Sequence, residues 1–157
     1  MKDTLITLIF LCFLIILMPR RKSKSKKTRK KKKRKSKKNS NLQKNIYNKS
    51  LKSCSMNPLT GYHRSGYCFT DDMDQGTHTV CAKVNNKFLD YTKTMGNDLS
   101  TPRDNFPGLK NGDKWCLCAL RWKEAMNSGV APPLDLNSTN KETLKYIDLD
   151  TLKNYKI

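Results

Sequence analysis

Acidic residues are almost missing from the first third of this 157-residue chain. Residues 1–50 hold one acidic residue against 18 lysines and arginines, a net charge of +17, whereas residues 51–157 hold 12 against 14, a net charge of +2. The overall net charge of +19 therefore belongs to the N-terminal segment. This distribution excludes a uniformly basic globular domain that binds nucleic acid through its fold.

The sequence also lacks the glycine-rich and serine motifs of several common enzyme classes. It has seven glycines and two histidines. No serine lies in a strand–elbow–helix pattern, and "GYHRSG" at 61–66 has too few glycines and no following helix for a phosphate-binding loop. These absences argue against an α/β-hydrolase and against a nucleotide-binding loop.

The chain has no apolar run as long as an ordinary transmembrane helix. The run Leu5 to Met18 has 14 residues before Pro19. As a helix it would span about 21 Å at ~1.5 Å per residue, against a hydrocarbon core of about 30 Å. No small-residue cleavage site follows, so a short membrane anchor over residues 1–19 is favoured over the alternative, a cleaved signal peptide.

A polybasic segment follows the apolar run directly. Fifteen of the 19 residues from Arg20 to Lys38 are basic, and such a segment has nothing to bury, so we expect residues 20–44 to form a disordered linker. The positive-inside rule then predicts a single-pass membrane protein whose C-terminal domain is cytosolic. The predicted partners are the membrane and its anionic lipid head groups, with nucleic acid as the less favoured partner. Secretion after signal-peptide cleavage is the alternative location.

Residues 45–157 have the size and mixed patterning of one α+β domain, expected to be a two-layer sandwich of helices on a small sheet. The local patterns predict a strand at His78–Val84 and a helix over 85–95, capped by Asn85 or Asn86 and stopped by Gly96. They also predict a short strand at 133–137, a helix after a capping box from Thr139 to Glu142, and a last helix capped by Asp148.

The stretch "GDKWCLCALRWKEAM", Gly112 to Met126, carries two cysteines one residue apart. Apolar residues at helical spacing, with Asp113 as N-cap and Gly129 as stop, predict one continuous helix. In a helix, Cys116 and Cys118 would point to nearly opposite sides. The pattern therefore predicts Cys118 in the core and Cys116 as a thiol near the helix N-terminus.

Candidate site residues follow from these expectations. The catalytic candidates are Cys116, His78 and Arg121. A small-ligand rim is expected at Asn97, Asp98, Ser100 and Thr101, although short polar side chains in turns also bond their own loop. A metal site, zinc being the candidate ion, would need the fold to gather ligands from Cys54, Cys68, His78, Cys81 and Cys116. Disulfides are disfavoured if the domain is cytosolic.

Four segments follow one another in an order and spacing that resemble a known family. They are "CSMNPLTGYHRSGYC", "DMDQGTHTVCA", "FLDYTKTMGNDLSTP" and "FPGLKNGDKWCLCALRWKEAMNSGVAPPL". They resemble the mostly bacterial family of domain of unknown function 2237, from about Asn45 to Tyr155. The resemblance implies a two-layer α+β domain with no established activity. Tyr67 and Asn140 stand where that family leads us to expect a cysteine and a histidine, which removes two possible metal ligands.

Two functions remain open from the sequence. The favoured one is a membrane-tethered binding or structural module facing the cytosol. The alternative is a thiol- or metal-dependent enzyme that uses a cluster of cysteine and histidine. The sequence alone leaves open whether the protein is an enzyme.

Overall fold

A computed structural model describes residues 43–157 of the chain. The predicted anchor at 1–19 and nearly all of the predicted linker at 20–44 lie outside the described residues. Within residues 43–157, no helix is long and apolar enough to cross a membrane.

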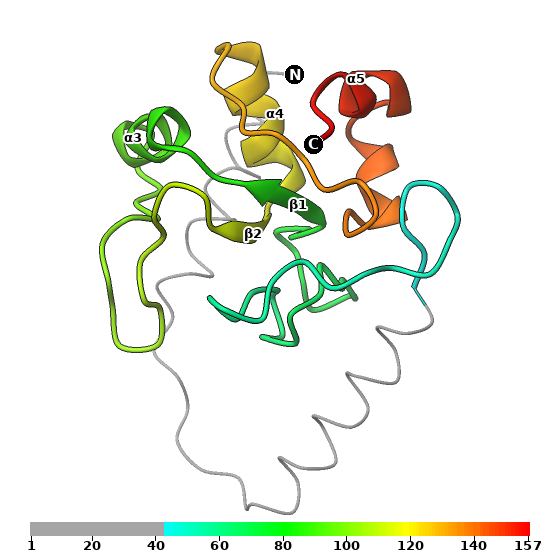
Figure 1. Cartoon of the computed structure of the whole chain (residues 1–157), viewed down its shortest axis with the longest axis horizontal. Helices are drawn as coiled ribbons and strands as arrows, with labels where there is room; N and C mark the ends of the chain where they lie inside the picture. The colour runs from blue at the N-terminus through cyan, green and yellow to red at the C-terminus, as the bar shows by residue number, and fades with distance from the viewer. Residues whose placement is uncertain (1–42) are drawn as a thin grey trace, which may run out of the picture.

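The described domain is built on one two-stranded antiparallel sheet. Strand β1 (Val80–Lys83) pairs with β2 (Lys114–Leu117), so that Val80 lies opposite Leu117 and Cys81 opposite Cys116. Three α-helices and one 3-10 helix complete the fold: α3 (Asn86–Thr94), α4 (Ala119–Asn127), η1 (Lys141–Lys145) and α5 (Leu149–Asn154). In Figure 1 the helices lie on one side of the sheet, and the irregular segment that precedes β1 lies on the other. The predicted α+β class is confirmed.

Both faces of the sheet are buried, and each face contacts a different core. Val80 and Ala82 of β1 belong to the main apolar core, as do Trp115 and Leu117 of β2. The intervening Cys81 and Cys116 point the other way and join Cys54 and Cys68 in a second cluster. Side chains alternate between the faces of a strand, so each strand contributes to both cores.

The double burial explains why one sequence prediction is wrong. The continuous helix expected from Gly112 is instead strand β2, then Cys118 in the N-cap position, then α4. A short strand buried on both faces shows no alternation of polar and apolar residues. The apolar residues of β2 therefore match the helical spacing of α4, and the pattern predicts a helix over both. Asp113 does not cap α4, because its Oδ2 accepts a hydrogen bond from the Lys110 amide. Gly129, at φ 67°, does follow the helix as predicted.

The other helix signals fare better. Asn85 caps α3 and accepts from the Phe88 amide at 2.8 Å, and Gly96 follows the helix at φ 77°. Asp148 caps α5 as predicted. The cap of η1 is Asn140, one residue later than expected. The strand expected at 133–137 forms only isolated bridges, through Leu134.

Candidate functional site

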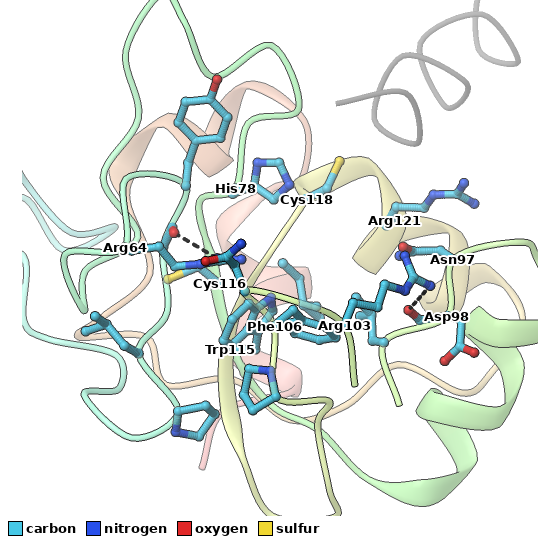
Figure 2. A pocket seen from close by; sticks show the side chains of 18 of the residues that line it. Arg64, His78, Asn97, Asp98, Arg103, Phe106, Trp115, Cys116, Cys118 and Arg121 are labelled. Carbon is cyan, nitrogen blue, oxygen red and sulfur yellow. Dashed lines mark hydrogen bonds between the residues drawn. The ribbon is translucent and has the colours of Figure 1, made fainter. Parts of the chain in front are cut away.

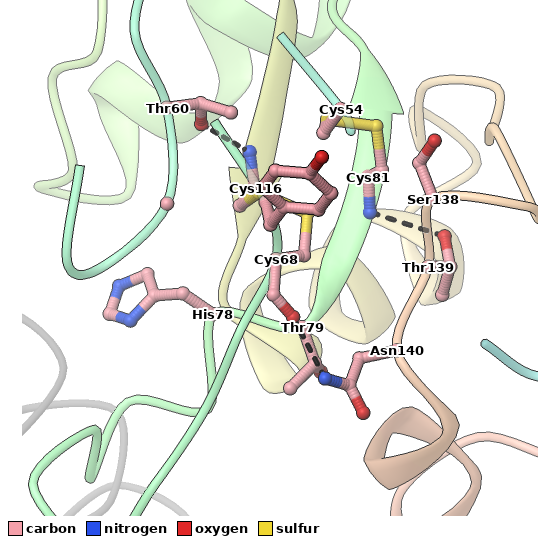
Figure 3. Close-up of a disulfide and its surroundings, with 12 residues drawn as sticks. Cys54, Thr60, Cys68, His78, Thr79, Cys81, Cys116, Ser138, Thr139 and Asn140 are labelled. Atoms are coloured by element: carbon pink, nitrogen blue, oxygen red, sulfur yellow. Dashed lines mark hydrogen bonds between the residues drawn. A yellow bond between two sulfur atoms is a disulfide. The ribbon is translucent and has the colours of Figure 1, made fainter. Parts of the chain in front are cut away.

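Four cysteines gather beneath the sheet and form two disulfides. Cys54 is bonded to Cys81, and Cys68 to Cys116, across 27 and 48 residues of sequence. All four side chains are buried. Figure 3 shows the cluster on the face of β1 and β2 that points away from the helices. Disulfides were disfavoured only on the condition that the domain is cytosolic; the structure forms them, since the fold brings these cysteines into bonding range.

The same cluster has the donor set of a metal site. The sulfur atoms of Cys54, Cys68 and Cys81 lie within 4.8 Å of one another. A cysteine binds a metal through its deprotonated thiolate, so these sulfur atoms cannot act as ligands while they are disulfide-bonded. His78 does not join the cluster; Figure 3 shows its ring directed away from the cysteines. Of the predicted ligands, the structure thus gathers the four cysteines and excludes the histidine.

Hydrogen bonds fix the backbone around the cluster. The Cys116 amide donates to Thr60 Oγ1 at 2.8 Å, and the Cys81 amide donates to Thr139 Oγ1 at 3.2 Å. Asn140 Nδ2 donates to the Cys68 carbonyl at 2.9 Å (Figure 3). Asn140, which stands where a histidine was expected, therefore has a structural role that links η1 to the cysteine cluster.

A cavity of about 1070 Å³ opens beside the start of α4. Its walls come from two loops, at 57–64 and 97–107, from β2, and from His78 just before β1. Cys118, at the N-cap of α4, also lines it. Figure 2 shows Cys118 next to the His78 ring at one end of this cavity.

His78 is held by one buried carboxylate. Asp74 is 2% exposed, and its Oδ1 lies 2.6 Å from His78 Nδ1 while its Oδ2 accepts from the His78 backbone amide at 2.8 Å. An ionised carboxylate can only accept, so Nδ1 carries the proton of this bond. The other ring nitrogen, Nε2, is thereby left to serve as acceptor in the neutral imidazole.

Backbone bonds set the position of Cys118 relative to His78. The Ala119 amide, at the start of α4, donates to the Thr77 carbonyl at 3.1 Å. Thr77 directly precedes His78, and Ala119 directly follows Cys118. This bond lies just beyond the last pair of the β1–β2 ladder, Val80 and Leu117, and holds the segments of His78 and Cys118 side by side.

The electrostatics of His78 reflect these neighbours. Burial alone would lower the pKa of His78, but the hydrogen bond that its ring donates to Asp74 and the negative charge of Asp74 raise this pKa, and so does charge on Cys118. Arg64 acts in the opposite direction, and the net result is a His78 pKa above its ordinary value of 6.5. Tyr62 stacks on the ring with centroids 5.9 Å apart. Burial, followed by the charges of Asp74 and Asp71, raises the Tyr62 pKa.

Cys118 has the surroundings of a nucleophile. It is the cysteine of residues 43–157 that forms no disulfide; its side chain is buried, at 6% exposed, where it lines the cavity, and it caps no amide of α4. No acidic residue lies in the first turn of that helix, so the positive end of the helix dipole meets no local carboxylate. A helix N-terminus and a protonated histidine both favour the thiolate form of a cysteine.

Of the three predicted catalytic candidates, the structure keeps two at the cavity and replaces the third. Cys116 lies within β2 and is bonded to Cys68, so the role of thiol at the helix N-terminus passes to Cys118. His78 and Arg121 both line the cavity. Arg121 is 6% exposed and its Nη1 lies 2.9 Å from Glu124 Oε2.

The predicted ligand rim is divided. Asn97 and Asp98 line the cavity, whereas Ser100 and Thr101 do not. Asp98 accepts hydrogen bonds from Ser100 and Thr101, and these bonds, those of Thr101 first, hold the pKa of its carboxyl far below the ordinary value. Both expectations for this loop thus apply: it bonds itself, and it borders the cavity.

Sequence reasoning missed Asp74. The prediction of Cys118 in the core is confirmed, since it is 6% exposed, but its position at the N-cap of α4 was not predicted. Asp74 lies four positions before His78 in the same loop, whereas Cys118 lies on the segment brought beside His78 by the pairing of β1 with β2. The one available signal was the pair of segments "DMDQGTHTVCA" and "GDKWCLCALRWKEA", which contain all three residues and carry the family resemblance.

Comparison with known proteins supports that resemblance. Residues 44–156 match the family described as "Uncharacterized protein conserved in bacteria (DUF2237)". No functionally curated protein matches the sequence. The chain therefore belongs to the DUF2237 family, through a domain that includes Asp74, His78, Cys118 and the four disulfide-bonded cysteines.

Proposed function

We propose that this domain is a thiol-dependent enzyme in which Cys118 is the nucleophile, His78 the general base and Asp74 the residue that orients His78. The observation that carries the proposal is the buried Asp74–His78 bond, which ends beside Cys118 in a cavity. A nucleophile, a base and a group that orients the base form the arrangement that covalent catalysis requires.

Acyl transfer is the reaction that best fits these parts. The Cys118 sulfur attacks a substrate carbonyl and its proton passes to His78 Nε2, so that a sulfur–carbon bond forms. The bond between the acyl carbon and the leaving group breaks, and the leaving group takes the proton from His78. Water, activated by the same histidine, then hydrolyses the thioester and releases a carboxylic acid.

The binding-module interpretation, favoured by the sequence alone, gives no reason for the Asp74–His78 pair. A buried carboxylate has a desolvation cost, and the stability it returns by bonding His78 does not require that the histidine line an open cavity beside a thiol. Perturbed titratable groups that line a cavity are typical of catalytic sites. The Asp74–His78 pair beside Cys118 therefore favours an enzyme over a binding module.

A zinc ion in the cysteine cluster is the second candidate. The observation that favours it is the proximity of the Cys54, Cys68 and Cys81 sulfurs, with Cys116 beside them. Four thiolates match the ligand set of a structural zinc site, but only after both disulfides are reduced. Metal content per chain, measured before and after reduction with zinc supplied, decides this: no uptake by the reduced chain rules it out.

The location of the domain is linked to the same chemistry. Disulfides persist in oxidising compartments and are rare in the cytosol. The two disulfides therefore favour the secreted alternative over the predicted cytosolic orientation, whereas reduced cysteines would fit the cytosol. The membrane anchor and the lipid-binding tract stay predictions. Counting blocked and reactive thiols in protein taken directly from cells tests the location.

Selective alkylation of Cys118 tests the enzyme proposal. The full-length chain in mild detergent, with Cys12→Ala to remove the cysteine of the apolar run, is treated with iodoacetamide at pH 7 without reductant. We expect Cys118 to react at least about tenfold faster than glutathione, because a thiolate and not a thiol is the attacking species. His78→Gln should remove most of that advantage. Peptide mass mapping identifies the modified residue.

Two results would overturn the proposal. One is a Cys118 that reacts with iodoacetamide only after denaturation, which would make it a packed core thiol. The other is a rate that His78→Gln leaves unchanged in a folded protein. His63→Gln is the matched control, because it removes the other histidine, which does not line the cavity.

A further inference from the structure

The wall of the cavity facing Cys118 and His78 carries an arginine held by its own turn. The Arg64 backbone amide and its Nη1 both donate to the Gly61 carbonyl, at 2.9 and 3.2 Å. The guanidinium lies over the Trp115 ring, 4.8 Å from its centroid. Figure 2 shows the Arg64 side chain between Trp115 and the His78–Cys118 end of the cavity.

The turn that presents Arg64 is built for this position. Gly61 has a φ of 91°, and a Cβ there would collide with the Tyr67 carbonyl, so the position admits only glycine. Arg64 itself has a φ of 50°, a conformation that non-glycine residues rarely adopt. Stacking on Trp115 and bonding to Gly61 orient the guanidinium before any ligand arrives, which reduces the entropy lost on binding.

The positive charge of Arg64 acts on His78. It lowers the pKa of the His78 ring, so the guanidinium lies within electrostatic range of that ring. A second arginine of the cavity, Arg103, donates from Nη2 to the Asp98 carbonyl at 3.1 Å. These two side-chain bonds, from Arg64 and from Arg103, both go to backbone carbonyl oxygens.

Most carboxylates around the cavity are hydrogen-bonded or ion-paired to other residues. Asp98 accepts from Ser100 and Thr101 and lies 3.3 Å from Lys93. Glu124 pairs with Arg121. Asp104 also lines the cavity, on the exposed loop that forms its rim. At the Cys118 end, the Asp74 carboxylate is likewise bonded to His78.

We infer that the substrate carries a carboxylate, bound by the Arg64 guanidinium while Cys118 attacks a second, electrophilic carbon of the same small molecule. This inference rests on the proposed function, which it deepens by naming the substrate class. The planar fork of an arginine matches a carboxylate in a two-bond geometry that a lysine cannot reproduce.

Two alkylating reagents that differ in one group test the inference. Iodoacetate and iodoacetamide deliver the same carbon to a thiol, but only iodoacetate carries a carboxylate. In the full-length Cys12→Ala chain, we expect the ratio of the iodoacetate rate to the iodoacetamide rate at Cys118 to exceed that ratio for glutathione roughly tenfold. Arg64→Gln should return the ratio to the glutathione value, and Arg64→Lys should give an intermediate ratio. Lys110→Gln, which removes an exposed positive charge that does not line the cavity, should leave the ratio unchanged.

The outcomes separate this inference from the proposed function. Rapid iodoacetamide labelling with no preference for iodoacetate would overturn the carboxylate site and leave the nucleophile intact. Slow labelling by both reagents would overturn the nucleophile. An Arg64→Gln variant that slows both reagents equally would make Arg64 a structural residue. If that variant fails to fold, competition serves instead: acetate should protect Cys118 from iodoacetamide more than acetamide does, and equal protection would contradict the inference.

Discussion

The Nδ1 atom of His78 lies 2.6 Å from Oδ1 of Asp74, and the second oxygen of the same carboxylate accepts from the His78 backbone amide. One buried side chain thus fixes both the ring and the main chain of the histidine. Because the His78 segment is bonded to the first residue of α4 through Thr77 and Ala119, the same carboxylate also sets the histidine relative to Cys118.

Replacing Asp74 by asparagine should lower the reactivity of the Cys118 thiol without abolishing it. An amide at this position cannot act as a charged acceptor toward both donors of His78, so the ring loses its fixed tautomer and its electrostatic support. We expect the rate of Cys118 alkylation to fall about tenfold or more, and the free energy of unfolding to drop by about 1–3 kcal/mol. The rate is measured by peptide mass mapping and the free energy by urea titration.

The control for that variant is Asp72→Asn, which alters an exposed carboxylate two residues away. It should change neither quantity. Equal alkylation rates in the Asp74 and Asp72 variants would show that Asp74 has no part in activating the thiol.

Stability should depend on pH through His78. The pKa of His78 is raised above 6.5 in the folded state, so its stabilising contribution is fully present below 6.5 and is lost as pH rises through the folded pKa. The difference in free energy of unfolding between the wild-type chain and His78→Gln should therefore be larger at pH 5.5 than at pH 8.5. Urea titrations at the two pH values measure it. A difference that grows with pH would contradict the charged Asp74–His78 pair.

Each disulfide should contribute measurably to stability. Cross-links that close loops of 27 and 48 residues restrict the unfolded chain, at about 3–4 kcal/mol each in the chain-entropy model. The double change Cys54→Ser and Cys81→Ala should lower the free energy of unfolding by about 2–5 kcal/mol. A stability that is equal with and without reductant would mean that the cysteines are not bonded in solution.

The sequence left open whether Asn85 or Asn86 caps α3, and two alanine variants can test which residue does. Asn85→Ala removes the acceptor of the Phe88 amide and should cost about 0.5–2 kcal/mol of the free energy of unfolding. Asn86→Ala, at the exposed first residue of the helix, should cost less or nothing. The opposite order would assign the cap to Asn86.

Elements with local signals could be predicted from the sequence. Asn85, Gly96 and Asp148 act through bonds to residues a few positions away, so their neighbours in sequence contain the information. The α+β class followed from the same local signals. The strand at 114–117 could not be recognised, because Trp115 and Leu117 face one core while Cys116 faces another.

The site could be predicted only in part, for a related reason. His78, Arg121, Asn97 and Asp98 were expected to meet at a ligand site, and all four line the cavity. The predicted burial of Cys118 is confirmed, whereas the prediction of Cys116 near the helix N-terminus is wrong, because α4 begins at Ala119 and not directly after Asp113. Asp74 lies only four positions before His78, but an aspartate at that spacing in a loop is no recognised motif, so its bonds to His78 appear only in the structure.

A trapped acyl group on Cys118 would test the central claim most directly. The full-length Cys12→Ala chain is mixed with p-nitrophenyl acetate at neutral pH, and nitrophenolate release is followed from the first moments while quenched samples are mapped by peptide mass. We predict a burst of about one nitrophenolate per chain, with one acetyl group on Cys118, absent in Cys118→Ser and strongly slowed in His78→Gln. Release at the same rate in the wild-type chain and in Cys118→Ser, with no acetyl group on Cys118, would contradict a catalytic thiol at this site.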